Sequence, residues 1–185
     1  IKSMKVIKNK LPKKTKISNI VTTADLKQKF DIEKLNDYSW GIYDQISYNG
    51  ICGYVKTPEM KGKVTLFTSG KMISIGSNTI QNSIDQLNQT KFYLLQENLI
   101  HDIKLEPLVR NMVSTITFDK PLNLKKLVKK IPNSIYEPDI FSGLRYKIKE
   151  GLSALIFSSG KVVVAGSKSV QDISYAYSKI RTYVE

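Results

Sequence analysis

The sequence predicts an α+β fold in which one antiparallel-sheet unit occurs twice, once in each half of the chain. The first observation is a repeated segment, because residues 66–77 (LFTSGKMISIGS) return 90 residues later as residues 156–167 (IFSSGKVVVAGS). The second is that both halves present strand, turn and helix signals in the same order. A repeat of this length indicates a duplicated structural unit, and strands grouped apart from helices favour antiparallel sheets.

Each half is predicted to begin with a strand and a short helix. The strands are expected over residues 17–25 and 109–118, and the short helices follow Asp31 and Asn123. Both residues are suitable N-caps, because a side-chain oxygen there accepts a hydrogen bond from a backbone N–H of the first turn.

A meander of three strands follows in each half. The strands are expected over residues 51–56, 63–68 and 71–76 in the first half and over residues 144–149, 152–158 and 161–166 in the second. The dipeptide Ser159-Gly160 indicates a tight hairpin turn, whereas Pro58 and Gly62 indicate a longer one. A long amphipathic helix is then expected over residues 78–97 and again over 169–184.

The charge of the chain favours a polyanionic partner. The net charge is +13 and the pI is about 9.7, which is typical of proteins that bind nucleic acid or an anionic membrane surface. Residues 1–15 are expected to be a basic arm, and the two repeats are expected over residues 16–100 and 101–185. No apolar run approaches 18 residues, so we expect no membrane span.

Cysteine and histidine usage excludes several kinds of site. Cys52 and His101 are the only residues of their types, so neither an intramolecular disulfide nor a zinc site built from these residue types can form. The Ser-Gly-Lys motifs lack the spaced glycines of a phosphate-binding loop. We therefore expect no enzyme activity, metal or cofactor.

Trp40 and Tyr43 are expected to pack in the core.

The strands of the second half have two apolar faces. Within residues 154–157 and 162–165, both the odd-numbered and the even-numbered positions are apolar, and alternate residues of a strand lie on opposite faces. The helices can cover only one face. The other is either buried by the other half, as in a sandwich, or exposed as an apolar surface for a partner.

Two segments of the second half give the sequence a specific resemblance. Residues 136–144 (YEPDIFSGL) and 155–168 (LIFSSGKVVVAGSK) closely resemble the second repeat of the TATA-box-binding protein core domain. The resemblance covers about residues 16–185 and is weaker in the first half. It implies a saddle with two pseudo-symmetric repeats, one curved ten-stranded antiparallel sheet and four helices on the convex face. This family is itself a known example of minor-groove binding with inserted apolar wedges.

The resemblance implies DNA contacts in both repeats. The wedge positions are Tyr48, Phe67, Phe141 and Phe157. The floor and hydrogen-bonding positions are Asn19, Val21, Ile73, Ile75, Asn111, Val113, Leu155, Val163 and Ala165. The phosphate contacts are Lys71, Lys147, Lys161 and Lys168. Since A·T pairs present only acceptors in the minor groove, an apolar floor with a few donors would select A·T-rich DNA.

The first repeat departs from the family pattern. Tyr48 replaces a phenylalanine, Thr65 replaces an apolar floor residue, and Ile75 and Ala165 stand where the family has threonine. These departures predict a less strict preference for the family's usual element, with central hydrogen bonding left mainly to the two asparagines.

The resemblance also implies partners. Glu137 and Asp139 match the acidic loop that receives a TFIIB-type initiation factor, although a solvated turn is the alternative. A TFIIA-type factor or TBP-associated factors are further expected partners, and the exposed face would suit a homodimer in the absence of DNA. The implied function is a general transcription initiation factor, located in the nucleus or alternatively in an archaeal cytoplasm or a virus. The alternative is a TBP-like paralogue that acts as an adaptor or has altered DNA specificity.

Overall fold

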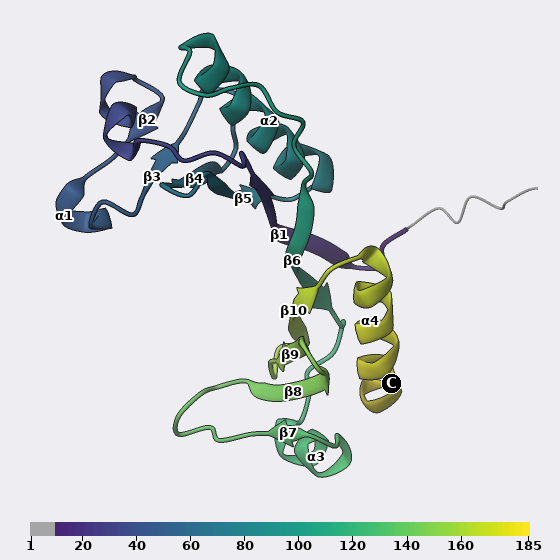
Figure 1. The fold of residues 1–185 in the computed structure, drawn as a ribbon. Helices are drawn as coiled ribbons and strands as arrows, with labels where there is room; N and C mark the ends of the chain where they lie inside the picture. Colours follow the sequence, from purple (N-terminus) through teal and green to yellow (C-terminus); the bar gives the residue numbers. More distant parts are fainter. Residues whose placement is uncertain (1–9) are drawn as a thin grey trace, which may run out of the picture. The chain divides into compact units, whose positions relative to one another are not determined.

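The computed structural model describes residues 10–185, so most of the predicted basic arm lies outside the described residues. The described strands form one sheet in the order β2-β3-β4-β5-β1-β6-β10-β9-β8-β7 (Figure 1). This arrangement is a single sheet, not the sandwich that the two apolar faces left open. The chain divides into two compact units, one of residues 18–111 and one of residues 112–185 together with the chain up to Ile17. Each unit is described by itself.

The first half contains strands β1 to β5 and three helical segments. In chain order these are β1 (Thr15–Asp25), the 3-10 helix η1 (Ile32–Asp37), β2 (Gly41–Ile42), α1 (Gln45–Tyr48), β3 (Cys52–Val55), β4 (Lys63–Phe67), β5 (Lys71–Ser77) and α2 (Ile80–Gln96). The neighbouring strands within this half pair antiparallel.

The second half repeats this order with one helix fewer. It contains β6 (Leu108–Thr117), α3 (Leu124–Lys130), β7 (Ser134–Ile135), β8 (Leu144–Lys149), β9 (Leu152–Ile156), β10 (Lys161–Ser167) and α4 (Val170–Val184). Its strands also pair antiparallel. The predicted strands and long helices are present within a few residues of their expected ends.

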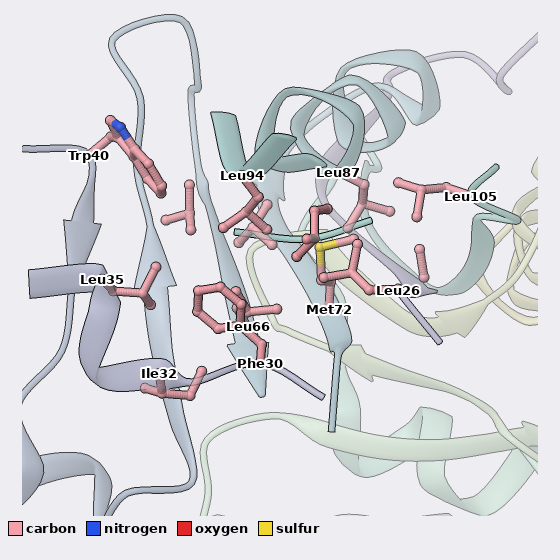
Figure 2. Packing of buried hydrophobic residues seen from close by; sticks show 14 of the residues in the cluster. Leu26, Phe30, Ile32, Leu35, Trp40, Leu66, Met72, Leu87, Leu94 and Leu105 are labelled. Atoms are coloured by element: carbon pink, nitrogen blue, oxygen red, sulfur yellow. The ribbon is translucent and has the colours of Figure 1, made fainter. Parts of the chain in front are cut away.

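Each half has its own core between one face of the sheet and the long helix. In the first half, Leu87 and Leu94 of α2 lie over Leu66 and Met72 of the sheet (Figure 2). Each such side chain contributes about 1.5–3 kcal/mol of hydrophobic stabilisation when fully buried. Trp40 and Tyr43 are buried with exposed fractions of 8% and 9%, which confirms their predicted place in the core.

Polar side chains cap the helices η1, α2, α3 and α4, two of them at the positions that the sequence predicts, Asp31 and Asn123. Asp31 caps η1, and Asn123 caps α3 by accepting a hydrogen bond from the N–H of Lys126. Thr79 and Ser169 do the same for α2 and α4. These caps satisfy backbone donors that have no acceptor within the helix.

The two Ser-Gly turns of the repeated segment need glycine for two reasons. Gly70 and Gly160 have φ values of +90° and +93°, a region that side chains other than glycine rarely adopt. A Cβ atom at these positions would also lie 2.1 Å from the carbonyl oxygen of Gln28 and 2.3 Å from that of Phe118. The same backbone approach recurs in both halves, which explains why the motif is repeated.

Three short elements were not predicted from the residue pattern. They are the two-residue strands β2 and β7 and the four-residue helix α1. A strand of two residues is too short to show alternation. Helix α1 is instead a single turn, capped by Asp44, whose side chain accepts a hydrogen bond from the N–H of Ile46.

Candidate nucleic-acid interface

In each half the helices cover one face of the sheet and leave the other partly exposed, and we call the second face the open face. In β1, Ile20, Thr22 and Ala24 are buried, whereas the alternate residues Val21 and Thr23 are only half-buried. The same alternation occurs in β5 and β10. The open face therefore carries the side chains that a partner of the sheet would contact.

The open face of the second half is mainly apolar at its centre. Val163 of β10 lies opposite Leu155 of β9 and opposite Thr115 of β6, and Leu155 in turn lies opposite Arg145 of β8. Three of the predicted floor residues, Val163, Leu155 and Ala165, are half-buried here. The cationic Arg145, which the sequence did not point to, ends this row.

Beside that row, two predicted wedge residues form an aromatic pair. The rings of Phe141 and Phe157 meet edge to face with 5.9 Å between their centroids. The guanidinium of Arg145 lies 5.1 Å from the centre of the Phe141 ring, a cation–π distance. Gly143 lies against both rings, since a Cβ atom there would be 2.8 Å from one ring and 3.0 Å from the other. The pair thus presents two half-buried apolar rings beside the row.

The open face of the first half has the same plan with more polar residues. Ile73 of β5 lies opposite Thr23 of β1 and opposite Thr65 of β4, and Thr65 lies opposite Tyr54 of β3. The hydroxyl of Thr65 thus interrupts the apolar row at the position where the second half has Leu155. Ile75 lies two pairs further along, opposite Lys63.

The pairing register of β3 differs from the sequence alignment of the two halves. Taking Tyr48 as the counterpart of Phe141 aligns residues 48–51 with residues 141–144 and so sets Ile51 against Leu144. In the structure, however, Gly53 pairs with Leu66, in the place where Leu144 pairs with Ile156. The alignment of this segment is therefore wrong by two residues. A shift of two keeps each side chain on its face, which is why alternation alone did not reveal it.

Because of this shift, Tyr48 has different surroundings from Phe141. It lies at the end of α1, and its ring contacts the ring of Tyr54 edge to face at 4.9 Å. Burial, followed by the neighbouring Tyr54, raises the pKa of the Tyr48 hydroxyl. The ammonium of Lys63 lies 3.7 Å from the centre of the Tyr54 ring. The wedge role assigned to Tyr48 stays a prediction, whereas Tyr54 and Lys63 are open-face residues that only the register reveals.

Asn19 is fixed by the backbone of the neighbouring strand. Its Oδ1 atom accepts a hydrogen bond of 2.8 Å from the N–H of Gly76, beside an irregularity in the pairing of β1 with β5. The amide is therefore oriented through its oxygen, and its NH₂ group is the part that can donate to a ligand. Asn111 is half-buried on β6, next to the irregularity in the pairing of β6 with β10.

The predicted phosphate contacts are exposed, but not all are equivalent. Lys71 and Lys161 occupy matching positions at the start of β5 and β10. Lys147 forms an ion pair of 2.7 Å with Glu150, and the hydrogen bond from Lys147 lowers the pKa of the Glu150 carboxyl. At Lys147, a phosphate would therefore compete with Glu150. The backbone N–H of Lys168 donates a hydrogen bond to the carboxylate of Asp172.

A cavity of about 480 Å³ lies beside Phe67 in the first half. Apolar side chains of Ile73, Met72 and Leu108 line it, and Lys71 and Arg110 stand at its edge. Arg110 donates a hydrogen bond of 2.8 Å from Nε to the hydroxyl of Thr23. The wedge position in this half therefore borders a hollow.

The acidic loop of the second half presents its carboxylates to solvent. The backbone N–H groups of Ile140 and Phe141 both donate to the carbonyl oxygen of Glu137, which closes a turn. Glu137, Asp139 and Ile140 are exposed on this turn, and 73% of the Ile140 surface is accessible. Two acids beside an exposed apolar side chain suit a cationic protein surface.

Other kinds of site were also sought in the described residues. Over residues 10–185, no group of three or more His, Cys, Asp or Glu side chains is arranged to hold a metal ion. None of the helices in this part of the chain has the length and apolar character needed to cross a membrane.

Comparison with known proteins gives one family throughout. The family model described as "Transcription factor TFIID (or TATA-binding protein, TBP)" matches residues 14–95 and 106–185. The TATA-box-binding protein of Cenarchaeum symbiosum is 37% identical over 158 residues, which cover 85% of this chain and 87% of that protein. The TATA-box-binding protein of Pyrococcus furiosus is 31% identical over 173 residues, with coverages of 90% and 87%.

A solved structure supports the same relationship. The structure of the Methanococcus jannaschii TBP aligns with a TM-score of 0.81 at 25% identity, and the alignment covers 92% of this chain and 97% of that one. Together with the strand order, this match confirms the fold class expected from the resemblance.

Proposed function

The chain belongs to the TATA-binding protein family of transcription factors, and from this premise we propose that it binds the minor groove of A·T-rich promoter DNA and bends it. The observation that carries the proposal is the aromatic pair of Phe141 and Phe157 beside the apolar row of the second half. Rings held in contact and only half-buried can enter a base step without first leaving a core. Unstacking a step costs a few kcal/mol, which the additional contacts of a bent duplex offset.

The hydrogen-bonding groups of the open face support readout of A·T pairs. The amide of Asn19 is oriented to donate, and the minor-groove edges of A·T pairs present only acceptors. Half-buried apolar residues on the open face, such as Val21 and Ile73, offer no acceptor to the exocyclic amino group of a G·C pair. A G·C pair at the centre would therefore lose hydrogen bonds that the solvent had supplied.

Replacing both rings tests the wedge assignment. We expect the double variant Phe141→Ala, Phe157→Ala to lose DNA bending, measured by fluorescence energy transfer between the two ends of a duplex. Both side chains are partly exposed, so the variant should keep a cooperative unfolding transition. Wild-type bending in the folded double variant would disprove the wedge role.

The exposed acidic turn supports recruitment of a TFIIB-type factor. We propose that Glu137 and Asp139 contact a cationic surface of that factor while Ile140 supplies an apolar contact. Charge reversal by Glu137→Lys with Asp139→Lys should abolish binding of the factor to the protein–DNA complex and leave DNA binding intact. Equal recruitment by the variant and the wild-type protein would show that the turn is only solvated.

Altered DNA specificity is the second candidate, and the first half favours it. Thr65 breaks the apolar row, and the side chain of Tyr54 lies where the second half has Arg145. Selection of bound duplexes from a random pool, with and without a TFIIB-type factor, distinguishes the candidates. An A·T-rich consensus supports the first, a different consensus supports the second, and no consensus under either condition favours an adaptor role.

Among the locations considered, the relatives support an archaeal cell. The named relatives come from archaea, which have no nucleus. We therefore propose the archaeal transcription system as the place of action in preference to the eukaryotic nucleus.

A further inference from the structure

The positive charge of this chain is not shared between the two repeats. Residues 18–111 contain ten Lys and Arg against ten Asp and Glu, so their formal net charge is zero. Residues 112–185 contain twelve against six, a net charge of +6. The remaining seven lysines precede residue 18. The whole excess of +13 therefore belongs to the compact unit that comprises the second half and the chain up to Ile17.

Much of that excess lies on one short helix. Helix α3 places Lys125, Lys126, Lys129 and Lys130 in solvent, and Lys120 is exposed just before it. The corresponding segment of the first half, η1 with its cap, instead carries three acids and one lysine over residues 31–37. One structural position thus has opposite charge in the two copies, so the fold does not require the lysines.

The last part of the basic arm neutralises the one acid in this region. The carbonyl oxygen of Lys14 accepts a hydrogen bond of 3.0 Å from the N–H of Thr117, and the ammonium of Lys14 forms an ion pair with Asp119. Lys120 and α3 follow directly in the chain. Asp119 is the only acid between residues 112 and 136, and the pair with Lys14 already neutralises it. Among the described residues, none of the five lysines from 120 to 130 forms an ion pair.

We propose that this surface, which we define as Lys120 and the four lysines of α3, binds the sugar–phosphate backbone of DNA that flanks the bent element. The proposal rests on the proposed function, because it takes the duplex bound to the open face as its ligand. Leu124 and Leu127 bury the other side of α3 in the core beneath α4, so its lysines lie outside the open face. In Figure 1, α3 adjoins β7, the outermost strand of this half.

The composition of the surface favours phosphate over a protein partner. Protein–protein interfaces are depleted in lysine and depend on buried aromatic and arginine anchors. Helix α3 offers no exposed aromatic or large apolar side chain, since Leu124 and Leu127 are buried and Val128 is half-buried. Lysines at such a position can neutralise phosphates without any particular base sequence. The contact should therefore add affinity and no sequence preference.

Comparing duplexes of two lengths tests the proposal. One duplex contains only the selected A·T-rich element, and the other adds mixed-sequence flanks on both sides. The variant has Gln at Lys125, Lys126, Lys129 and Lys130. The matched control has Gln at four exposed lysines of the first half, Lys29, Lys34, Lys61 and Lys104. A third variant with Arg at the four α3 positions keeps the charge.

We expect the wild-type protein, the control and the Arg variant to bind the long duplex more tightly than the short one. The α3 Gln variant should bind the short duplex as the wild-type protein does. Its ratio of affinities for the long and the short duplex should be at least tenfold lower than that of the wild-type protein. Its slope of log affinity against log salt on the long duplex should be less steep, by about 0.9 for each phosphate that the variant no longer neutralises.

Several outcomes would overturn the proposal. An equal flank gain in the α3 Gln variant would show that these lysines do not contact DNA. An equal loss on both duplexes would show that they act on the open face or on folding, and thermal unfolding separates these two. In a further outcome, the wild-type protein binds a poly-glutamate peptide, and only the α3 Gln variant loses this binding while it keeps the wild-type gain from the flanks. That result would assign the surface to an acidic protein. If the wild-type protein binds neither duplex, the proposed function itself fails.

Discussion

Gly143 lies where the rings of Phe141 and Phe157 leave no room for a side chain. Its backbone conformation does not demand glycine, since its φ angle is not positive. The constraint is instead the 2.8 Å and 3.0 Å that would separate a new Cβ atom from the two rings. The two rings therefore occupy their positions only because Gly143 has no side chain.

The variant Gly143→Ala should displace the rings and reduce DNA bending. Because the ring atoms involved are the ends of partly exposed side chains, the cost to folding should be small, within about 1 kcal/mol. Gly151→Ala is the contrasting control, since a Cβ atom there meets nothing within 4 Å but must adopt a φ of +75°. Energy transfer across a duplex and urea unfolding should show bending lost in the first variant and stability lost in the second.

A carboxylate at the start of α4 gives the second half a predictable response to acid. Asp172 accepts hydrogen bonds of 3.0 Å from the backbone N–H of Lys168 and from the ammonium of Lys149. The Lys168 amide first, and then the Lys149 ammonium, lower the pKa of this carboxyl. A carboxyl whose pKa is lower in the folded state stabilises the fold while it is ionised.

We expect Asp172→Asn to lower the free energy of unfolding at neutral pH by about 0.3–1 kcal/mol, the usual value of an acid at a helix N-terminus. Since the unfolded pKa of Asp is about 3.9, the stabilisation is complete above that value. It is lost as the pH falls further, through the lower folded pKa. The curves of wild type and variant should therefore converge in acid, and a difference that persists there would contradict this assignment.

Helix α2 is attached to its sheet by buried hydrogen bonds of Gln86 and Ser83. Gln86 donates from Nε2 to the hydroxyl of Ser74 at 2.8 Å, and its Oε1 accepts from the N–H of Gly62 at 2.8 Å. Ser83 on the same helix is within 2.8 Å of the hydroxyl of Thr22. At the position matching Gln86, the second half has Ala176, which is buried among apolar residues. The two copies thus keep one architecture with different chemistry between helix and sheet.

Removing the amide of Gln86 should destabilise the first half more than its size suggests. Gln86→Leu leaves the N–H of Gly62 and the hydroxyl of Ser74 without this partner, at a cost of about 1–3 kcal/mol for each buried group left unsatisfied. Urea unfolding monitored by circular dichroism measures the loss. The reciprocal variant Ala176→Gln should also destabilise, because its amide meets an apolar environment. Unchanged stability of Gln86→Leu would show that water replaces the amide.

At the scale of elements, the sequence predicts the regular parts of the fold and less of the pairing. The long helices and the strands of both meanders follow from apolar periodicity and glycine turns. The placement of Tyr54 opposite Thr65 does not follow, because a register shift of two residues preserves the alternation. The contact of Tyr48 with Tyr54 depends on that shift and on the single turn of α1. Only the second-half pair, Phe141 with Phe157, could be located in advance through its resemblance to a known repeat.

At the scale of the whole molecule, the two copies have diverged in the properties that matter for a DNA-binding protein. The second half has the aromatic pair, the cationic α3 and the acidic turn, while the first half has a neutral net charge and a polar interruption at Thr65. Two copies with unequal residues should distinguish the two directions of a nearly symmetric duplex.

We therefore expect one predominant orientation on DNA. In a Cys52→Ser protein, Ser178→Cys provides an exposed attachment point on α4 for an acceptor dye, and the donor is placed at one end of an A·T-rich duplex. Single-molecule energy transfer should give one main population, and moving the donor to the other end should change its efficiency. Two equal populations that stay the same after the exchange would show that the halves are equivalent to DNA.

The pairing of Cys52 with Phe67 has a practical consequence of its own. The chain has a single sulfhydryl, and it lies partly accessible in β3, directly across from an aromatic side chain of the proposed contact surface. Its rate of alkylation thus reports whether that surface is covered, whatever covers it. DNA, a second copy of the chain or a competing protein should each slow the reaction at this one sulfur atom, in a protein with no engineered residue.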